Sequence, residues 1–291
     1  MGGEALWDAR RVPVTFLAHQ AAVLPIQRRW PRCVDGVAAV AGSAAPDLAY
    51  VTRGWWGPGG IPMWFDGHRL QNVLVTGAVA SIIAALTRRV VLRVLPLALW
   101  DAGSLHLHDY RTLAFVRHRW WVTFASALIG IATHLVLDTF THEDGSGVGL
   151  FGGALSARVV VIGGRSVHGY TVLQYGGLLL MAGYVCWCVL RFGRERSFLD
   201  PRVPTARLAS GATVLFWAIV GVSSVISVAY GSTRLGRLPA QREIENKSVA
   251  VISACWVAFA GLLLASLAVV DGVVEDSGGS HEIADDRRVP G

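Results

Sequence analysis

Apolar segments long enough to cross a membrane constrain this chain more than any other feature. Four segments contain about twenty apolar residues each, the length that a helix needs to span about 30 Å of hydrocarbon. They cover Trp120–Phe140, Tyr170–Leu190, Leu208–Tyr230 and Val249–Val270, and two less uniform segments precede them at Val34–Val51 and Leu70–Leu86. Because backbone polar groups in lipid must be satisfied within the segment, these stretches predict helices. We therefore expect an all-α fold, a polytopic membrane bundle of about six transmembrane helices.

The composition agrees with a membrane protein. Of the 291 residues, 53% are hydrophobic and only 16% are charged, whereas about a quarter of the residues in a soluble domain are charged. The formal charge of +6 comes almost wholly from arginine, because Lys247 is the only lysine. In a membrane protein such charge is typical of topology signals and lipid-headgroup contact. We expect the lipid bilayer as a partner and no nucleic acid, and the pattern does not specify an oligomeric state.

Two shorter apolar pieces accompany the predicted spans. Val90–Trp100 is interrupted by Arg93 and Pro96, so we expect a re-entrant or interfacial helix there. Val14–Gln27 predicts a short helix that lies in the membrane or dips into it. We expect a single integral domain over residues 1–271, with loops such as Asp144–Gly153. Residues 272–291 are rich in Gly, Ser, Asp and Glu and predict a disordered polar tail.

The arginines suggest an orientation for the spans. Clusters precede the first span, follow the second at Arg88 and Arg89, precede the third and fill the loop after the fourth. If these clusters are cytoplasmic, six spans result with both termini inside. Four basic residues would then lie outside and count against this scheme, namely Arg234, Arg237, Arg242 and Lys247.

Three potential metal ligands, His134, Asp138 and His142, lie at the end of one apolar segment. An ionisable group in hydrocarbon is costly unless it finds a partner, so such groups in a span indicate function. Spacings of four residues place all three on one helix face. An intact helix separates His134 from His142 by about 12 Å, too far for one ion. Therefore one ion can bind an adjacent pair, and His142 serves a second ion, carries protons, or lies beyond a bend at the helix end.

Other ionisable residues fall on the same side of the membrane in the six-span scheme. Asp47 lies near the outer end of the first span, and His68 lies just before the second. His19 precedes the first span, so it joins the others only if Val14–Gln27 is re-entrant. The alternative is structural: Asp47 caps a helix or pairs with an arginine, and the histidines are satisfied core residues.

Several motifs together resemble a known bacterial membrane family, domain of unknown function 4184. The matching elements are Pro13–Pro25 around His19, Gly42-Ser43 with Pro46-Asp47, His68, Thr133–His142, and Leu173-Gln174. They cover residues 13–190, and the two spans in 191–271 match only in being apolar. The family is similar to membrane-bound metal-dependent hydrolases of the bacterial inner membrane.

The resemblance implies a metal site built from five residues, with His142 close by: His19, Asp47, His68, His134 and Asp138. It also implies a multi-pass location in the bacterial inner membrane. One departure concerns the hydrolases' Gly-His-Arg-Gly…His-Ser motif, which is reduced here to Gly67-His68-Arg69-Leu70. The missing second histidine puts a complete two-metal site in doubt.

The expected function is a membrane-bound, metal-dependent hydrolase. A divalent ion, zinc or manganese given the mixed donors, would activate water against an ester, amide or phosphoester in a lipid-like substrate. His142 or Glu143 would act as general base, and Arg69 would orient an anionic headgroup. Two alternatives remain open. The same His/Asp array could serve a proton- or cation-coupled transporter, or it could be a structural metal site in a non-catalytic protein.

Overall fold

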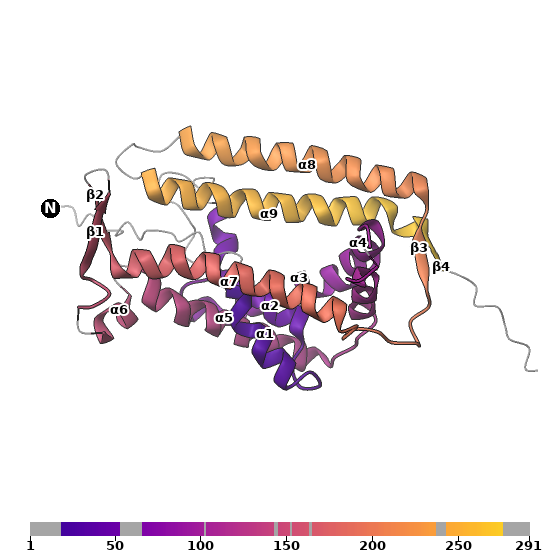
Figure 1. Ribbon diagram of the computed structural model, residues 1–291, viewed down its shortest axis with the longest axis horizontal. Helices are drawn as coiled ribbons and strands as arrows, with labels where there is room; N and C mark the ends of the chain where they lie inside the picture. The colour runs from indigo at the N-terminus through magenta and orange to yellow at the C-terminus, as the bar shows by residue number, and fades with distance from the viewer. Residues whose placement is uncertain are drawn as a thin grey trace, which may run out of the picture.

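The computed structural model describes residues 19–52, 66–101, 103–142, 145–151, 153–162, 165–236 and 243–275 (Figure 1). The helices are α1 His19–Arg29, α2 Gly36–Ala44, η1 Ala45–Thr52, η2 Leu70–Asn72, α3 Val73–Leu86, η3 Thr87–Val91, α4 Leu92–Ala98, η4 Leu107–Ala114, α5 Trp120–Thr141, α6 Ser146–Leu150, α7 Gly169–Arg194, α8 Ser210–Gly236, α9 Glu243–Val269 and η6 Val270–Gly272. The strands are β1 Arg158–Ile162, β2 Arg165–His168, β3 Ala206–Leu208 and β4 Val273–Glu275.

Most of the predicted spans are long apolar helices in the structure. Those long enough to cross a membrane are Leu70–Ala98, Trp120–Thr141, Gly169–Arg194, Ser210–Thr233 and Val249–Gly272. Gly36–Val51 is apolar but shorter, and at about 1.5 Å per residue it reaches about 24 Å, less than the hydrocarbon core. The prediction of an all-α polytopic bundle is confirmed, with this first segment as a short helix inside it.

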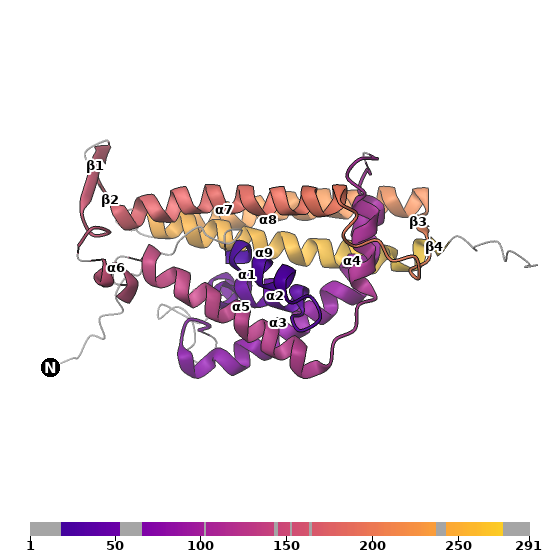
Figure 2. The ribbon, with the colours of Figure 1, turned by 60° about the horizontal axis from the view of Figure 1, so that its bottom comes forward.

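The long helices surround a small central group of helices. Helices α8 and α9 run side by side, and α7 follows the same direction, as Figures 1 and 2 both show. α1 and α2 lie near the middle, between α7, α9 and α5. α9 covers the end of α2 through Val249, Ile252 and Trp256, which pack with Ala44. The central helices are therefore shielded from lipid by longer ones.

The segment Val90–Trp100, for which the sequence predicts a re-entrant or interfacial helix, is joined to the preceding span. A π-helical turn, η3, joins α3 to α4 in one helical run that ends at Ala98. The charge of Arg93 is tolerated because its side chain faces outward against the Phe115 ring, 5.8 Å away, while Val94 is fully buried. Pro96 lies in the last turn of α4, so it interrupts little of the helix.

Short elements occupy three places where loops or a tail were predicted. The predicted loop Asp144–Gly153 contains α6. A β-hairpin, β1 with β2, follows it and leads directly into α7. The predicted tail from Gly272 begins with β4, which pairs antiparallel with β3. Hydropathy did not reveal these pairs because each strand is only three to five residues long.

Helices α2 and α5 approach each other backbone to backbone. A Cβ atom added at Gly42 would lie 2.8 Å from the carbonyl carbon of Ala127, and one at Gly130 would lie 2.7 Å from the nitrogen of Ser43. Only glycine permits such an approach, as is common where helices pack in membranes. The contact sets the register between η1, which continues α2, and the last turns of α5.

A buried ion pair holds the first end of α2. Asp35 is fully buried and caps the helix by accepting a hydrogen bond from the Ala38 N–H, 3.0 Å away. The same carboxylate accepts a hydrogen bond from Thr123 Oγ1 at 2.8 Å and pairs with the Arg88 guanidinium. The Arg88 side chain, which charge counting assigns to a cytoplasmic cluster, is mostly buried at η3.

Candidate metal centre

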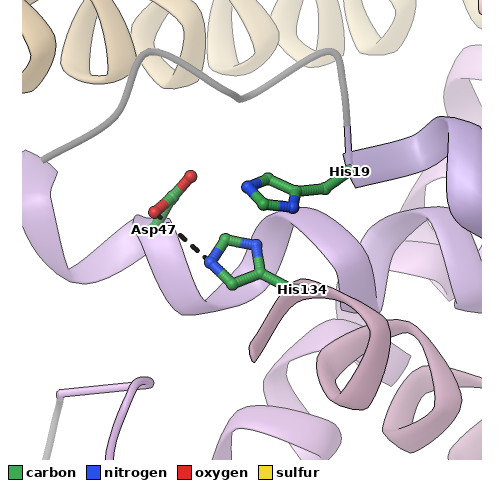
Figure 3. A group of neighbouring side chains, drawn as sticks. All are labelled: His19, Asp47 and His134. Carbon is green, nitrogen blue, oxygen red and sulfur yellow. Dashed lines mark ion pairs between the residues drawn. The ribbon is translucent and has the colours of Figure 1, made fainter. Parts of the chain in front are cut away.

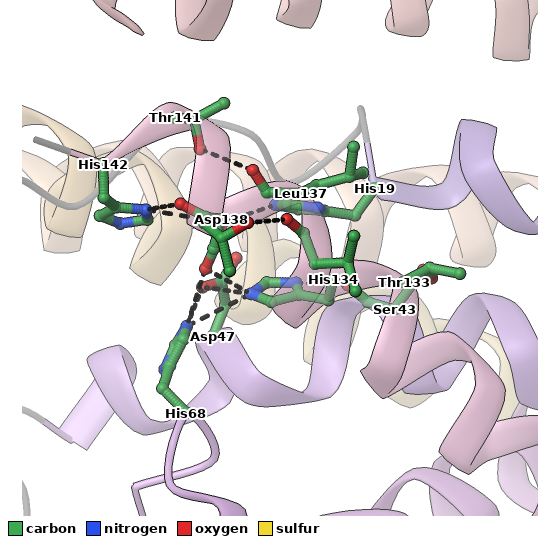
Figure 4. A network of polar contacts seen from close by, with 12 residues as sticks. His19, Ser43, Asp47, His68, Thr133, His134, Leu137, Asp138, Thr141 and His142 are labelled. Atoms are coloured by element: carbon green, nitrogen blue, oxygen red, sulfur yellow. Dashed lines mark hydrogen bonds and ion pairs between the residues drawn. The ribbon is translucent and has the colours of Figure 1, made fainter. Parts of the chain in front are cut away.

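Four separate chain segments bring the five predicted metal ligands together (Figure 4). His19 is the first residue of α1, Asp47 lies in η1, His68 precedes η2, and α5 supplies His134 and Asp138. His19, Asp47 and His134 are at most 2% exposed, and Figure 3 shows these three side chains converging. The sequence prediction that these residues gather in space is therefore met by the structure.

The donor atoms cluster around Nε2 of His134. This atom lies 3.2 Å from Asp138 Oδ2, 3.2 Å from His68 Nε2 and 3.7 Å from Asp47 Oδ1. His68 Nε2 lies 3.5 Å from Asp138 Oδ2 and 3.6 Å from Asp47 Oδ1. Around a tetrahedral ion with bonds of about 2.0–2.2 Å, donors lie about 3.3–3.6 Å apart. Separations of this size make His68, His134 and Asp138 a suitable donor set for one divalent ion, with Asp47 Oδ1 3.6 and 3.7 Å from the two histidines.

The backbone of α2 orients His134. Its Nδ1 lies 2.8 Å from the carbonyl oxygen of Ser43, which can only accept a hydrogen bond, so Nδ1 carries the proton. The lone pair of the neutral ring is then on Nε2, the atom that faces the other donors. Histidine ligands of metals are usually held by such an outer hydrogen bond. The close packing of α2 on α5 is what brings Ser43 within reach.

His19 belongs to the cluster, although charge counting could not place it. Its ring lies against that of His134, with centroids 3.9 Å apart, and its Nε2 is 3.6 Å from Asp138 Oδ1. His19, Asp47 and His134 form a second group whose donor atoms all lie within 4.8 Å of one another. The short helix α1 thus carries His19 into the protein interior. The predicted residues 14–18 of that helix lie outside the described residues.

His142 lies just past the end of α5, as one of the three sequence alternatives proposed. It is the C-cap of the helix, with an extended backbone. Its Nδ1 donates a hydrogen bond to the carbonyl of Asp138 at 2.8 Å and lies 4.0 Å from Asp138 Oδ1. The ring therefore folds back toward the cluster. Glu143, the other predicted general base, lies outside the described residues.

Asp66 organises the loop that carries His68, a role that the sequence reasoning missed. Its Oδ1 accepts a hydrogen bond from the His68 N–H at 3.1 Å and lies 3.6 Å from His68 Nδ1. Its Oδ2 accepts one from Arg69 Nε at 3.1 Å. Burial alone would raise the pKa of Asp66, but the hydrogen bonds from His68 and Arg69 outweigh it and lower the pKa to about 2. Asp66 is thus an anion that turns Nε2 of His68 toward the other donors.

Tyr50 is a second neighbour that the sequence reasoning missed. Its ring centroid lies 5.4 Å from that of His68. In the sequence, Asp66 stands two residues before the candidate His68, and Tyr50 stands three residues after the candidate Asp47. Neither spacing indicates contact by itself, because Asp66 and Tyr50 meet His68 only in the folded chain. Close packing of Gly67 on Pro46, whose Cα would lie 2.6 Å from an added Cβ, brings these segments together.

The electrostatics of the cluster favour a cation. Asp47 Oδ2 and Asp138 Oδ1 are buried and accept no hydrogen bond from the described residues. Burial alone would lower the pKa of His68, but Tyr50 and the carboxylates of Asp138, Asp47 and Asp66 raise it well above its usual value. Buried carboxylates need a compensating positive charge. A proton on histidine or a bound metal ion can supply it.

A comparison with protein families covers nearly the whole chain. The model of a family described as Domain of unknown function (DUF4184) matches residues 12–270. No curated protein and no solved structure matches the chain. The match includes every candidate donor and extends through the last two apolar helices, beyond the residues 13–190 that the motifs covered. The chain therefore belongs to this family, the domain of unknown function 4184.

Proposed function

We propose that this protein is a metal-dependent hydrolase that cleaves an ester, amide or phosphoester bond in an amphiphilic substrate. The observation that carries the proposal is the spacing of three further donors around His134 Nε2, from 3.2 to 3.7 Å. Three distant segments contribute imidazole and carboxylate groups at these separations, and such a mixed donor set fits zinc or manganese. Intramembrane ionisable groups are also functional more often than structural.

In this proposal each side chain has a distinct task. His134, His68, Asp47 and Asp138 hold the ion, and His19 is a fifth donor beside them. When bound, a divalent ion lowers the pKa of water toward neutrality and polarises the substrate oxygen. The hydrogen bond that His134 Nδ1 donates to the Ser43 carbonyl, and the Asp66 carboxylate 3.6 Å from His68 Nδ1, keep the two Nε2 atoms aimed at one point.

The general base is proposed to be His142, with Glu143 as the adjacent candidate. His142 Nδ1 is engaged with the Asp138 carbonyl, so Nε2 is the atom that can accept a proton. The side chains of His68, Asp138 and His142 are 16%, 11% and 11% exposed, whereas that of His134 is fully buried. Substrate is therefore proposed to approach from the His68 and His142 side. There Arg69, paired with Asp66, would meet an anionic headgroup.

A proton or cation relay is less well supported by the same geometry. A relay needs polar groups at successive depths through the bilayer. Here the α5 donors lie in the last two turns of a 22-residue helix, and the other segments join them there. We propose that the centre lies at one face of the bacterial inner membrane, the location that the family resemblance implies.

Metal analysis combined with a substrate screen tests this function. Protein purified in detergent is expected to contain about one zinc or manganese ion per chain, and to hydrolyse at least one lipid-like ester, amide or phosphoester. A chelator should abolish product formation, and the added metal should restore it. Absence of stoichiometric metal would contradict the proposal. Bound metal without product would favour a structural site, and ion flux in proteoliposomes would favour a transporter.

The Asp66→Asn variant tests the carboxylate that lies beside the His68 ring. Asparagine keeps the shape and an oxygen acceptor but removes the negative charge beside His68 Nδ1. Loss of such a partner typically lowers metal affinity about 10–100-fold, and we expect a decrease in this range in a competitive zinc titration. Asp200→Asn is the control, because Asp200 instead accepts the backbone N–H of Arg202 at 2.9 Å. Equal affinities in the two variants would show that Asp66 does not support the centre.

A further inference from the structure

A group of exposed apolar side chains lies between α5 and α7. We name it the apolar rim: Leu150 and Phe151 at the end of α6, with Val159, Val160 and Val161 in β1. These side chains are 81%, 58%, 60%, 45% and 50% exposed. Full burial of one such side chain is worth about 1.5–3 kcal/mol, so leaving five of them in water is unfavourable. Contiguous exposed apolar groups mark an interaction surface.

The apolar rim is held firmly against the transmembrane helices. A Cβ atom at Gly147 of α6 would lie 2.6 Å from the Phe140 ring, and the Phe140 and Phe151 rings meet edge to face at 5.9 Å. Between the two parts of the rim, the Leu155 carbonyl accepts a hydrogen bond from the N–H of Tyr170, in the first turn of α7, at 2.8 Å. These contacts attach the rim to the last turn of α5 and the first turn of α7. Its orientation relative to the membrane is therefore set by the bundle.

Helix length places the apolar rim at the membrane boundary. From Gly169 to Leu190, α7 contains no charged residue, and Arg191 is the first. Twenty residues of helix span about 30 Å, so counting back from Arg191 places the other hydrocarbon boundary near Thr171. Twenty residues counted forward along α5 from Arg119 place the corresponding boundary near Thr139. The α5 boundary thus lies just before α6 and the α7 boundary just after the β-hairpin, at one end of the long helices (Figures 1 and 2).

The surface beside the apolar rim identifies its partner as lipid. Val172 and Leu173, in the first turn of α7, are 47% and 43% exposed and belong to the surface that faces the acyl chains. The rim lies beside this surface, since β1 pairs with β2 and β2 ends at His168, directly before α7 begins at Gly169. Arg158, exposed at the start of β1, carries a positive charge that attracts the negative phosphate of a lipid headgroup.

We propose that the apolar rim inserts into the boundary between headgroups and acyl chains of the leaflet next to the metal centre. His142 lies four residues before Ser146, where α6 begins, so the rim and the open side of the centre share one membrane face. A substrate that reaches the centre would then come from the plane of that leaflet. The membrane contact itself stands whether or not the centre hydrolyses a substrate.

Site-directed spin labelling measures this insertion. Cys33, Cys186 and Cys255 are replaced by serine, and Cys188 is kept because it is only 2% exposed. Val160→Cys and Leu150→Cys are labelled with a nitroxide and reconstituted in vesicles of phosphatidylethanolamine and phosphatidylglycerol. Collision with oxygen, which concentrates in lipid, is compared with collision with a water-soluble nickel complex. Leu179→Cys, 74% exposed in the middle of α7, is the lipid control, and Ser197→Cys, exposed after α7, is the water control.

The expected ratio of oxygen to nickel accessibility at both rim positions is several-fold higher than at Ser197 and approaches that at Leu179. A ratio equal to that at Ser197 would show that the rim faces water. A label shielded from both reagents, with spin–spin broadening between chains, would show that a second copy covers the rim instead. Either of the last two results overturns the proposal, and neither depends on catalysis.

Discussion

Under the proposed function, an Asp138→Asn variant is expected to lose the bound divalent ion while keeping its helical fold. Asp138 Oδ2 lies 3.2 Å from His134 Nε2 and 3.5 Å from His68 Nε2, so the carboxylate contributes directly to the donor set. A neutral amide of the same size keeps the packing but removes the charge that attracts the ion. Since even an outer-shell partner is worth about 10–100-fold in affinity, we expect a loss of at least about 100-fold. Elemental analysis and competitive titration measure it.

Asp109→Asn is the matched control for this variant. Asp109 also carries a paired carboxylate, but it pairs with Arg196 at 3.0 Å on the surface outside the membrane helices. Under the proposed function, the Asp109→Asn variant should retain about one ion per chain. Stoichiometric metal in Asp138→Asn would contradict the assignment of the centre. A variant that loses metal and thermal stability but keeps the cellular function would indicate a structural rather than a catalytic ion.

A Gly42→Val variant is expected to lose the packing between α2 and α5. The added Cβ would clash with backbone atoms of Ala127, which no side-chain rotation can relieve. Overpacking typically costs about 1–3 kcal/mol and occasionally more, and a clash with backbone belongs at the upper end. Because total stabilities are only about 5–15 kcal/mol, we expect a large decrease in the melting temperature of the detergent-solubilised protein, measured by circular dichroism. The Ser43 carbonyl would also move away from His134, so metal binding should weaken.

Gly176→Val is the control for the packing variant. Gly176 also lies in a transmembrane helix, α7, but no atom lies within 4 Å of an added Cβ at this position. The valine should therefore face lipid, with a melting temperature close to that of the unaltered protein. A similar melting temperature for Gly42→Val would show that α2 and α5 separate easily, and the site geometry would then not depend on their contact.

Much of the fold follows from local pattern. Bilayer thickness sets the length of an apolar helix, so segments such as Trp120–Phe140 and Tyr170–Leu190 predicted α5 and α7 closely. Helical periodicity predicted the pairing of His134 with Asp138, because residues four apart lie on one face. The rise of the helix also separated His142 from His134. Each of these inferences needs only neighbouring residues.

The features that the sequence did not reveal depend on contacts between distant residues. Arg88 resembles a topology signal in sequence, yet it pairs with Asp35, 53 residues away. The segment Val90–Trp100 was predicted as separate because Arg93 and Pro96 interrupt its apolar pattern. Its outward-facing arginine and terminal proline are compatible with a continuous helix once α8 and α9 pack on Val94. A hydropathy scale assigns an unfavourable value to a charged residue in an apolar segment. It contains no information on a distant residue that pairs with this charge in the folded chain.

The sequence by itself determined that the protein is an all-helical membrane bundle and which ionisable residues are unusual in it, because burial costs and helix periods act locally. Only the tertiary structure decided how those residues meet. Gly42, Gly130 and Gly67 permit backbone contacts that bring α2, α5 and the His68 loop together. Asp66 and Ser43 then orient two histidines from outside the donor set. Such contacts join segments up to 91 residues apart and depend on close packing, which no local pattern encodes.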